Sequence, residues 1–381
     1  MNDGGGAART RVRIVGGSIA GLFAAILLDR QGFDVRIYER SGSNLSGRGA
    51  GLTGGRELFD AIRSIGCSHV SSLAVVSKRQ IILDRQGRVV AEHDAAGARF
   101  SWDLLYRTAR SKLPEDKYVQ NRHVSRVLDG DDTATIVFDD NSTDVADLVI
   151  GADGIASVVR EAVNPLNHEN RYAGYAAWRI LLPEADLPNS LQPYREDLVG
   201  FSEPGIQSIG YMVPGAAGEV SPGGRRYSWG WYRGSPRGDL GAIFTTASGR
   251  QFEYSLPPGG MSEVRVAKFR LEAASNLPPQ FAAIASARAE PWVQGIFDYT
   301  PRQFVGRRIA LVGDAAALAR PHVGLGTSKA AGDAVTLADA VQTSSSIAEA
   351  LQKYEQARLP SAIDLVQRSI EIGISLELSA D

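Results

Sequence analysis

A strand-like run passes directly into a glycine-rich loop near the start of the chain: Val12-Arg13-Ile14-Val15-Gly16-Gly17-Ser18-Ile19-Ala20-Gly21. Helical character follows over Ile19–Arg30, and a second strand-like run covers 35–39. In a dinucleotide-binding βαβ unit the first glycine makes a tight turn, the second admits the pyrophosphate, and the third lets the helix pack on the strand. Gly16 and Gly21 fill the first and third places, and Ser18 takes the second. This pattern predicts a Rossmann-like domain of the α/β class.

The helix after this loop points its free amides and the positive end of its dipole toward bound negative charge. Glu39 ends the second strand, where a carboxylate can accept hydrogen bonds from ribose hydroxyls. The alternative interpretation is a glycine turn beside an ordinary surface glutamate. The predicted nucleotide-binding residues here are Gly16, Ser18, Ile19, Ala20, Gly21, Glu39, Arg40 and, in a later strand, Val124.

Two further loops of the same kind follow apolar runs, Gly151-Ala152-Asp153-Gly154 in the middle of the chain and Gly313-Asp314-Ala315-Ala316 near its end. Each can bring bare backbone against a nucleotide. One such loop is a weak signal, but three in this order indicate a single large flavin cofactor, FAD.

The composition is that of an ordinary globular protein, with 381 residues, 44% hydrophobic and 22% charged. Its 41 basic and 43 acidic residues give a net charge of -2, which provides no electrostatic reason to expect nucleic acid or a membrane as partner. Cys67 is the only cysteine, so an internal disulfide is impossible and no metal site is predicted. The amino terminus lacks an export-like apolar stretch, and a cytoplasmic location is expected.

The chain alternates between nucleotide-binding and mainly β character, which predicts an α/β (α+β) two-domain fold with an inserted substrate domain. The expected segments are a first FAD-binding part (1–77), a hairpin of the substrate domain (78–97), a second FAD-binding part (98–170), the substrate domain (171–291), a third FAD-binding part (292–340) and a C-terminal helical segment (341–381).

Several local elements are predicted within these segments. They are a glycine-rich loop over 47–55, a hairpin over 78–92 turning at 84–87, a helix over 102–112, a β-meander over 124–128, 133–138 and 145–150, and a helical tail from 347 that breaks at Pro360.

The three motifs together resemble the single-component FAD-dependent aromatic hydroxylases, the group typified by para-hydroxybenzoate and salicylate hydroxylases. The middle motif continues through Asp147–Arg160, and in that family it touches both FAD and the passing nicotinamide cofactor. The resemblance places Asp153 and Gly154 at the cofactor and Asp314 at the ribityl chain, and it extends to the tail at 354–360. Also implied as cofactor-binding are Arg48, Gly313, Pro321, Gly324, Leu325 and Gly326, the last four in a loop against the isoalloxazine ring.

Within that family, the segment at 172–179 and the sequence Arg320-Pro321-His322 are similar to those of the hydroxypyridine hydroxylases. Two departures concern flavin-ring contacts and substrate choice. Ala317 stands where many relatives have a histidine, and the helix start near Trp102 lacks an arginine that many relatives carry.

The resemblance implies that NADH or NADPH reduces FAD and that O2 then forms a flavin hydroperoxide. Its terminal oxygen attacks an electron-rich carbon of a small aromatic substrate, a hydroxylated pyridine or a phenol. A nearby base or hydrogen-bond acceptor helps by drawing proton density from a ring hydroxyl.

His322 is the only histidine in a loop expected to face the flavin, so it is the first candidate for this proton-handling role. Tyr211, in a strand-like run, is the second, although core packing explains such a tyrosine slightly more often. Trp229 and Trp231 share a strand face and are candidates for a pocket wall, with a buried sheet face as the alternative. Arg179 can pair with a substrate carboxylate, a cofactor phosphate or a structural carboxylate.

Two other functions are compatible with a flavin-binding chain. The sequence Trp229-Gly-Trp231 resembles the Trp-x-Trp-x-Ile-Pro motif of flavin-dependent halogenases, but it continues Tyr232-Arg233-Gly234. A redox carrier without hydroxylase activity is the second alternative, because a fold does not fix a function. A homodimer is expected from the family and from the frequency of two-fold assemblies.

Overall fold

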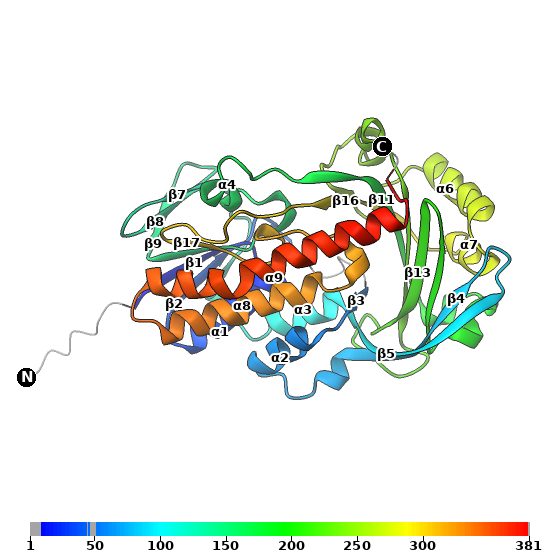
Figure 1. Cartoon of the computed structure of the whole chain (residues 1–381), viewed down its shortest axis with the longest axis horizontal. Helices are drawn as coiled ribbons and strands as arrows, with labels where there is room; N and C mark the ends of the chain where they lie inside the picture. The colour runs from blue at the N-terminus through cyan, green and yellow to red at the C-terminus, as the bar shows by residue number, and fades with distance from the viewer. Residues whose placement is uncertain (1–8, 44, 46–50, 380–381) are drawn as a thin grey trace, which may run out of the picture.

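The computed structural model describes residues 9–43, 45 and 51–379. Figure 1 shows two parts side by side along the long axis, and helix α9 (Ile347–Ser375) runs from one to the other. The predicted α/β class, with a Rossmann-like sheet and a separate mixed sheet, is confirmed. No helix within the described residues is both long and apolar enough to cross a bilayer.

The first part is built on a five-stranded parallel sheet. Its strands are, in spatial order, β17 (Ile309–Leu311), β10 (Leu148–Gly151), β1 (Arg11–Val15), β2 (Asp34–Tyr38) and β6 (Tyr118–Val119). Both faces of β1 are buried, as expected for a parallel sheet with covered faces. Helices α1 (Ile19–Arg30), α8 (Gly326–Thr343) and α9 lie in front of this sheet in Figure 1, with α8 packed against the other two.

A three-stranded antiparallel sheet joins the same hydrophobic core. It contains β7 (Val124–Asp129), β8 (Ala134–Phe138) and β9 (Thr143–Ala146). The short helices of this part are α2 (Arg56–Ser64), α3 (Trp102–Arg110) and α4 (Val159–Val163).

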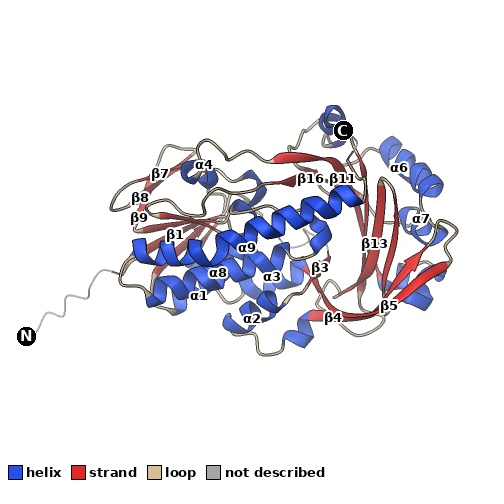
Figure 2. Ribbon diagram, in the orientation of Figure 1, coloured by secondary structure: helices blue, strands red, loops and turns tan. Residues whose placement is uncertain are grey.

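The second part is a nine-stranded mixed sheet, prominent in the right half of Figure 2. Its spatial order is β15 (Ser255–Leu256), β16 (Trp292–Asp298), β11 (Arg171–Pro183), β14 (Arg226–Gly234), β13 (Ile206–Val213), β12 (Leu198–Glu203), β4 (Ala74–Leu83), β5 (Val89–Ser101) and β3 (Gly51–Thr53). Its helices are α5 (Leu240–Ile243), α6 (Glu263–Asn276) and α7 (Pro279–Ala285).

The two faces of this sheet carry different residues because side chains alternate along each strand. Tyr227, Trp229 and Trp231 of β14 point to one face, where they share a core with Phe269 of α6 and Phe281 of α7. The residues between them, Ser228, Gly230 and Tyr232, therefore point to the opposite face.

The sheet curls so strongly that β13 also contacts β3, β4 and β5. Gly51 in β3 shows how close this approach is, because a Cβ there would lie 2.5 Å from the ring of Tyr211. The backbone amide of Gly51 donates to Ser228 Oγ at 3.0 Å. The concave face of the sheet is therefore closed on one side by β3.

The hairpin predicted over 78–92 is confirmed, with a tight turn at Gly87, whose φ is +78°. Three other local expectations are wrong. The loop over 47–55 contains strand β3. The strand expected over 145–150 is divided at Asp147, which accepts from the amide of Arg11 at 2.7 Å, so its halves join different sheets.

The helical tail does not break at Pro360, contrary to expectation, and α9 continues through it. Contacts on both sides of the proline hold the helix: Arg358 binds Asp333 of α8 at 2.9 Å, and Ser361 Oγ donates to the carbonyl of Arg358 at 3.0 Å. Tertiary packing therefore outweighs the local cost of the proline.

The nine-stranded sheet includes residues that are predicted to lie in the FAD-binding segments. Strand β3 and the ends of β4 and β5 belong to the nine-stranded sheet, although their residues fall in the predicted FAD-binding segments 1–77 and 98–170. The domain boundaries themselves stay predictions.

Candidate functional site

The first glycine loop is shaped by two positions where a side chain has no room. Gly16 has a φ of +101°, and a Cβ on it would lie 2.3 Å from the carbonyl oxygen of Ala152. A Cβ on Gly21 would lie 2.0 Å from the carbonyl oxygen of Gly16. The loop therefore depends on glycine for its turn, for its contact with the middle motif and for the packing of α1.

Glu39 fastens this loop from the neighbouring strand. Its buried carboxylate accepts from the amide of Gly17 at 2.8 Å and from the amide of Ser41 at 2.8 Å. The hydroxyl of Tyr118 donates to the carbonyl of Gly17 at 2.9 Å, a contact that the sequence did not predict. A ribose-binding role for Glu39 stays a prediction.

A cavity of about 330 Å³ opens where β1, β2 and the middle motif meet. Seven of the predicted cofactor residues line it: Gly16, Ser18, Glu39, Arg40, Val124, Asp153 and Gly154. The sequence did not predict the other lining residues, which are Val15, Gly17, Tyr38, Leu45, Trp102, Arg122, His123, Ala152, Ala156 and Val158. Ile19, Ala20 and Gly21 do not line it but form the first turn of α1. Arg48 lies outside the described residues.

Many relatives are expected to carry an arginine at the start of α3, and this chain does not. Trp102 lines the cavity at this helix start. The indole of Trp102 stacks on Tyr106, with ring centroids 5.2 Å apart and an interplanar angle of 4°. Arg226 reaches in from β14, and its Nη2 donates to Ser101 Oγ at 2.8 Å and to Asp103 Oδ1 at 2.9 Å. A guanidinium from the nine-stranded sheet therefore lies at this helix start.

Asp153 of the middle motif caps the start of α4. Its carboxylate accepts from Ser157 Oγ at 2.6 Å and from the amides of Val158 at 2.8 Å and Val159 at 3.2 Å. Burial raises the pKa of this carboxyl group, and these hydrogen bonds oppose the shift. Gly154 has a φ of +73°, and no described protein atom lies within 4 Å of the place that a Cβ would take, so this residue leaves one side open toward the cavity.

Arg160 joins the middle motif to the third one. It is buried, and it donates to the carbonyls of Asp314 and Ala315, each at 2.8 Å, and to Asn170 Oδ1 at 2.9 Å. Loops more than 150 residues apart in sequence are thus fixed to each other by one side chain.

Gly313 of the third motif is held by charged side chains of α8. Its φ is +62°, its amide donates to Asp333 Oδ2 at 3.0 Å, and its carbonyl accepts from Lys329 Nζ at 2.7 Å. Arg358 of α9 completes the network by donating to Asp333 Oδ1 at 2.9 Å. Hydrogen bonds to both the amide and the carbonyl of Gly313 therefore fix the turn that carries Asp314.

Asp314 is the accessible residue of this turn, and its carboxylate has no hydrogen-bond partner within the described ranges. It is solvent-accessible yet closely surrounded by protein, and this confinement raises the pKa of its carboxyl group. Ala317, three residues later, is buried in the hydrophobic core. A small side chain at 317 therefore fills a packing position here.

The loop Pro321–Gly326 is docked on the concave face of the nine-stranded sheet through His322. Its Nδ1 lies 2.8 Å from Gln207 Oε1, and its Nε2 lies 2.7 Å from the hydroxyl of Tyr175. With Gln207 Oε1 as acceptor, the proton is on Nδ1 and Nε2 accepts from Tyr175. Gly324, with a φ of +64°, ends the turn, and α8 begins at Gly326 after Leu325.

His322 is neutral in this setting. Burial lowers the pKa of its imidazole to about 4, with smaller contributions from Arg320 and Arg179. Because both ring nitrogens already contact protein groups, the arrangement suits His322 to orient Tyr175 and Gln207. To act as a general base on the substrate, His322 would have to give up its contact with Gln207 or with Tyr175.

The same concave face carries Tyr211 and Arg179. Burial raises the pKa of the Tyr211 hydroxyl to about 12, although the nearby Arg179 and Arg99 lower it. The hydroxyl of Tyr211 has no hydrogen-bond partner among the described residues, whereas Arg179 Nη2 donates to the hydroxyl of Tyr232 at 3.2 Å. The structural ion pair considered for Arg179 is absent from the described part of the chain.

Trp229 and Trp231 do not share this face, which corrects their prediction as pocket residues. They point to the opposite side of β14 into the core beneath α6, and Trp229 Nε1 donates to Ser208 Oγ at 2.8 Å. The period-two alternation that groups them also separates them from Tyr232 and Tyr211.

These features fit FAD. The glycine positions leave backbone bare at Gly16 and Gly154, the cavity can take the adenosine and diphosphate end, and the accessible carboxylate of Asp314 can accept from ribityl hydroxyls. No group of three or more potential metal ligands occurs among the residues that the structure describes.

Known proteins show the same combination of sequence and fold. The chain matches the family described as FAD binding domain over residues 9–216 and the one described as FAD binding domain-like over 172–298. It is 31% identical to 2,6-dihydroxypyridine 3-monooxygenase of Paenarthrobacter nicotinovorans, covering 92% of this chain and 87% of the relative. It is 26% identical to 6-hydroxynicotinate 3-monooxygenase of Pseudomonas fluorescens, covering 86% and 81%. The solved structure of 2,6-dihydroxypyridine-3-hydroxylase from Arthrobacter nicotinovorans superposes with a TM-score of 0.90 at 28% identity, covering 97% and 93%.

Proposed function

This chain belongs to the single-component FAD-dependent aromatic hydroxylases, and we propose that it adds one oxygen atom from O2 to a hydroxylated pyridine or a phenol, with NADH or NADPH as reductant. FAD, when bound, supplies the redox and oxygen chemistry. The relatives named for dihydroxypyridine and hydroxynicotinate favour a hydroxylated pyridine. We also expect a homodimer, since two-fold assemblies are the commonest among homo-oligomers.

One observation supports this proposal: the loop after the third motif is held by His322 against the sheet face that carries Tyr211. His322 of that loop contacts Gln207 on β13 and Tyr175 on β11. Tyr211 is on the same face of β13 as Gln207, and Arg179 is on the same face of β11 as Tyr175. A small aromatic ring between the loop and the sheet would therefore meet polar groups suited to a ring hydroxyl.

Tyr211 is the group that we assign to the substrate's ring hydroxyl. A pKa of about 12 keeps its hydroxyl protonated at neutral pH, so it can donate one hydrogen bond and accept another. His322, neutral and engaged at both nitrogens, orients Tyr175 and Gln207 around the same space. Tyr211 would thus stabilise negative charge developing on the substrate's oxygen by donating a hydrogen bond to it, and it would not take up the substrate's proton because its own hydroxyl is already protonated.

The two alternative functions are less well supported. A halogenase-like role for Trp229 and Trp231 has no structural basis here because both side chains lie in the core behind the sheet. A redox carrier would not need an accessible tyrosine and an arginine on the sheet face that contacts the His322 loop. Substrate-stimulated consumption of NADH or NADPH separates the hydroxylase from the carrier.

The direct test measures NADH and NADPH oxidation by the FAD-loaded protein in air, with hydroxypyridines, hydroxynicotinates and hydroxybenzoates as candidate substrates. We expect one class to accelerate oxidation and to yield a product heavier by one oxygen atom. If neither nicotinamide reduces the bound flavin under anaerobic conditions, the proposal of a self-sufficient hydroxylase fails.

Replacing Tyr211 by phenylalanine is expected to lower kcat about tenfold to hundredfold, because a hydrogen bond to a developing charge is lost. Stopped-flow measurement of hydroxylation with the identified substrate checks this. Tyr227→Phe is the matched control: Tyr227 lies near Tyr211 but points to the opposite face, and its buried hydroxyl has no partner among the described residues. That variant should keep wild-type kcat. Equal effects of the two substitutions would contradict the role of Tyr211.

A further inference from the structure

Two arginines next to Tyr211 have no acidic partner among the residues that the structure describes. Arg99 of β5 is buried and donates to the neutral hydroxyls of Thr53 at 2.8 Å and Ser77 at 3.2 Å. Arg179 of β11 donates to the hydroxyl of Tyr232 at 3.2 Å. Neither guanidinium forms an ion pair within residues 9–43, 45 and 51–379. Burial lowers the pKa of Arg99, as expected for a cation without a compensating carboxylate.

Elsewhere the chain pairs buried arginines with acids, which is the usual way to keep a charge away from water. Arg225 contacts Glu184 at 2.6 Å, and Arg320 contacts Asp298 at 2.8 Å. Arg160 is surrounded by backbone carbonyls instead. Arg99 and Arg179 have neither arrangement within the described part of the chain, so no described carboxylate neutralises their positive charge.

Both cations lie on the concave face of the nine-stranded sheet although their strands are far apart in the sheet order. The curl of the sheet brings β5 against β13, and the guanidinium carbon of Arg99 lies 5.3 Å from the centroid of the Tyr211 ring. Arg179 lies on the same face of the sheet, where its guanidinium carbon is 5.7 Å from the centroid of the Tyr232 ring. The described residues near Tyr211 therefore present two positive charges and neutral hydroxyls.

On the basis of the proposed hydroxylase function, we propose that Arg99 and Arg179 bind the aromatic substrate as an anion. The negative group is either a ring carboxylate or an ionised ring hydroxyl, and both are recognised by the planar donor set of a guanidinium. Arg99 and Arg179 would then determine specificity by excluding neutral rings of the same size, since a neutral ligand would leave two desolvated cations uncompensated.

The test compares anionic ligands with neutral analogues of similar shape. Dissociation constants for 6-hydroxynicotinate and 6-hydroxynicotinamide, and for 2,6-dihydroxypyridine and 2,6-dimethoxypyridine, are read from changes in the flavin absorption of the holoenzyme. We expect at least one anion-forming member to bind about tenfold to hundredfold more tightly than its neutral analogue. The pair that shows the preference distinguishes a carboxylate from a ring oxyanion as the bound group.

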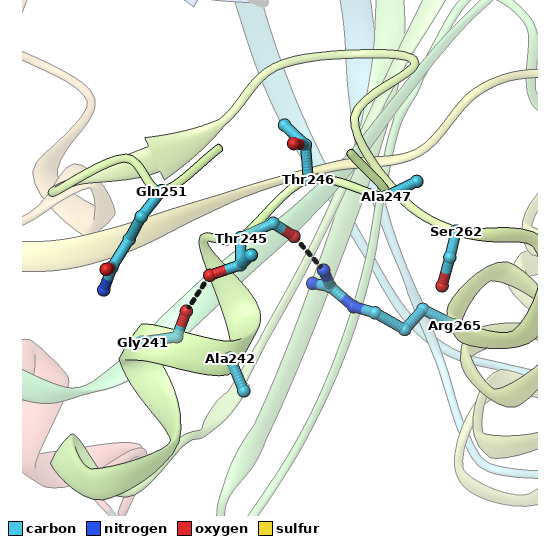
Figure 3. A pocket seen from close by; sticks show the side chains of 8 residues that line it. All are labelled: Gly241, Ala242, Thr245, Thr246, Ala247, Gln251, Ser262 and Arg265. Atoms are coloured by element: carbon cyan, nitrogen blue, oxygen red, sulfur yellow. Dashed lines mark hydrogen bonds between the residues drawn. The ribbon is translucent and has the colours of Figure 1, made fainter. Parts of the chain in front are cut away.

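Variants of each arginine locate the preference. Arg99→Met and Arg179→Met should each reduce it at least about tenfold, and Arg99→Lys and Arg179→Lys should restore part of it. Arg265→Met is the matched control. Figure 3 shows Arg265 in a separate pocket, with its hydrogen bond to the carbonyl of Thr245. The pocket has a volume of about 440 Å³, and Arg265 donates to the carbonyls of Thr245 at 2.8 Å and Ile243 at 2.5 Å. Burial also lowers the pKa of Arg265. Arg265→Met should leave the preference unchanged.

Three results would overturn the inference. The first is equal binding of the anionic and neutral members of both pairs by the wild type. The second is loss of FAD affinity in the methionine variants with an unchanged anion preference, which would assign the arginines to the flavin. The third is efficient NADH-driven or NADPH-driven hydroxylation of a neutral ring only, which would overturn the anion inference while leaving the hydroxylase function intact.

Discussion

Asp333→Ala is expected to lower the free energy of unfolding by about 3–5 kcal/mol and to weaken FAD binding at least about tenfold. Asp333 is fully buried and accepts from Lys329 Nζ at 2.7 Å, from Arg358 Nε at 2.9 Å and from the amide of Gly313 at 3.0 Å. Its removal leaves the ammonium of Lys329 buried without a carboxylate, because its remaining contacts are the carbonyl of Gly313 and, at 5.4 Å, the ring of Phe304. Breaking one side of a buried ion pair is costly for this reason.

The effect on FAD follows from the position of the network. Asp333 and Lys329 hold the amide and the carbonyl of Gly313, whose left-handed backbone sets the direction of Asp314. Without Asp333 the turn loses a hydrogen-bond partner and gains an unpaired cation beside it. The carboxylate of Asp314 would then be displaced from the position in which it can meet the cofactor.

Glu184→Ala provides a close control within the same chain. Glu184 is also buried, also pairs with an arginine (Arg225 Nη2 at 2.6 Å) and also accepts a glycine amide, that of Gly223 at 2.7 Å. It lies at the end of β11 in the nine-stranded sheet. We expect both variants to lose stability in urea unfolding and only Asp333→Ala to lose FAD affinity in flavin-fluorescence titrations. Wild-type FAD affinity in a folded Asp333→Ala protein would show that the network does not position the turn.

The nucleotide-binding unit could be predicted from the sequence because its determinants are local. Gly21 packs on the carbonyl of Gly16 five residues away, and the apolar runs that become β1 and β2 pair directly with each other. The contact of Gly16 with Ala152 is the exception, because it joins segments distant in sequence. Spacing along the chain therefore carries most of the information. The same holds for the hairpin, whose turn residues lie between its two strands.

The concave face of the nine-stranded sheet could be predicted only in part. Alternation along β14 correctly groups Tyr227, Trp229 and Trp231, but it does not say which group faces the loop that carries His322. That depends on α6 and α7, which follow later in the sequence and cover the tryptophan side. Tyr211 is on the concave face because Gln207 on the same strand meets His322 from a distant loop.

Contacts between distant segments account for the residues that the sequence did not reveal. Tyr118 reaches Gly17 across about 100 residues, and Arg160 reaches Ala315 across more than 150. Arg99 stands out because the described residues around it include no acidic partner, which only the folded chain can show. No spacing rule encodes such relations, because they depend on how the two sheets are placed and curled.

Gly16→Ala is expected to abolish stable FAD binding, so that the purified protein retains little flavin. An alanine at a φ of +101° is strained by about 1–2 kcal/mol. Its Cβ would also lie 2.3 Å from the carbonyl oxygen of Ala152 and 2.8 Å from the Cα of Asp153, both backbone atoms that cannot rotate away. The first loop would have to separate from the middle motif, and these two segments line the same cavity.

Gly32→Ala separates the steric effect from the backbone strain. Gly32 has a φ of +90°, close to that of Gly16, but no described atom lies within 4 Å of a Cβ there. Both variants carry the strain and should unfold at lower urea concentration than the wild type, whereas only Gly16→Ala also carries the clash. Flavin content after purification and FAD titration of the apoprotein provide the comparison. If the two variants bind FAD equally well, close contact between the first loop and the middle motif is not what forms the cofactor site, and the glycine at 16 serves the turn alone.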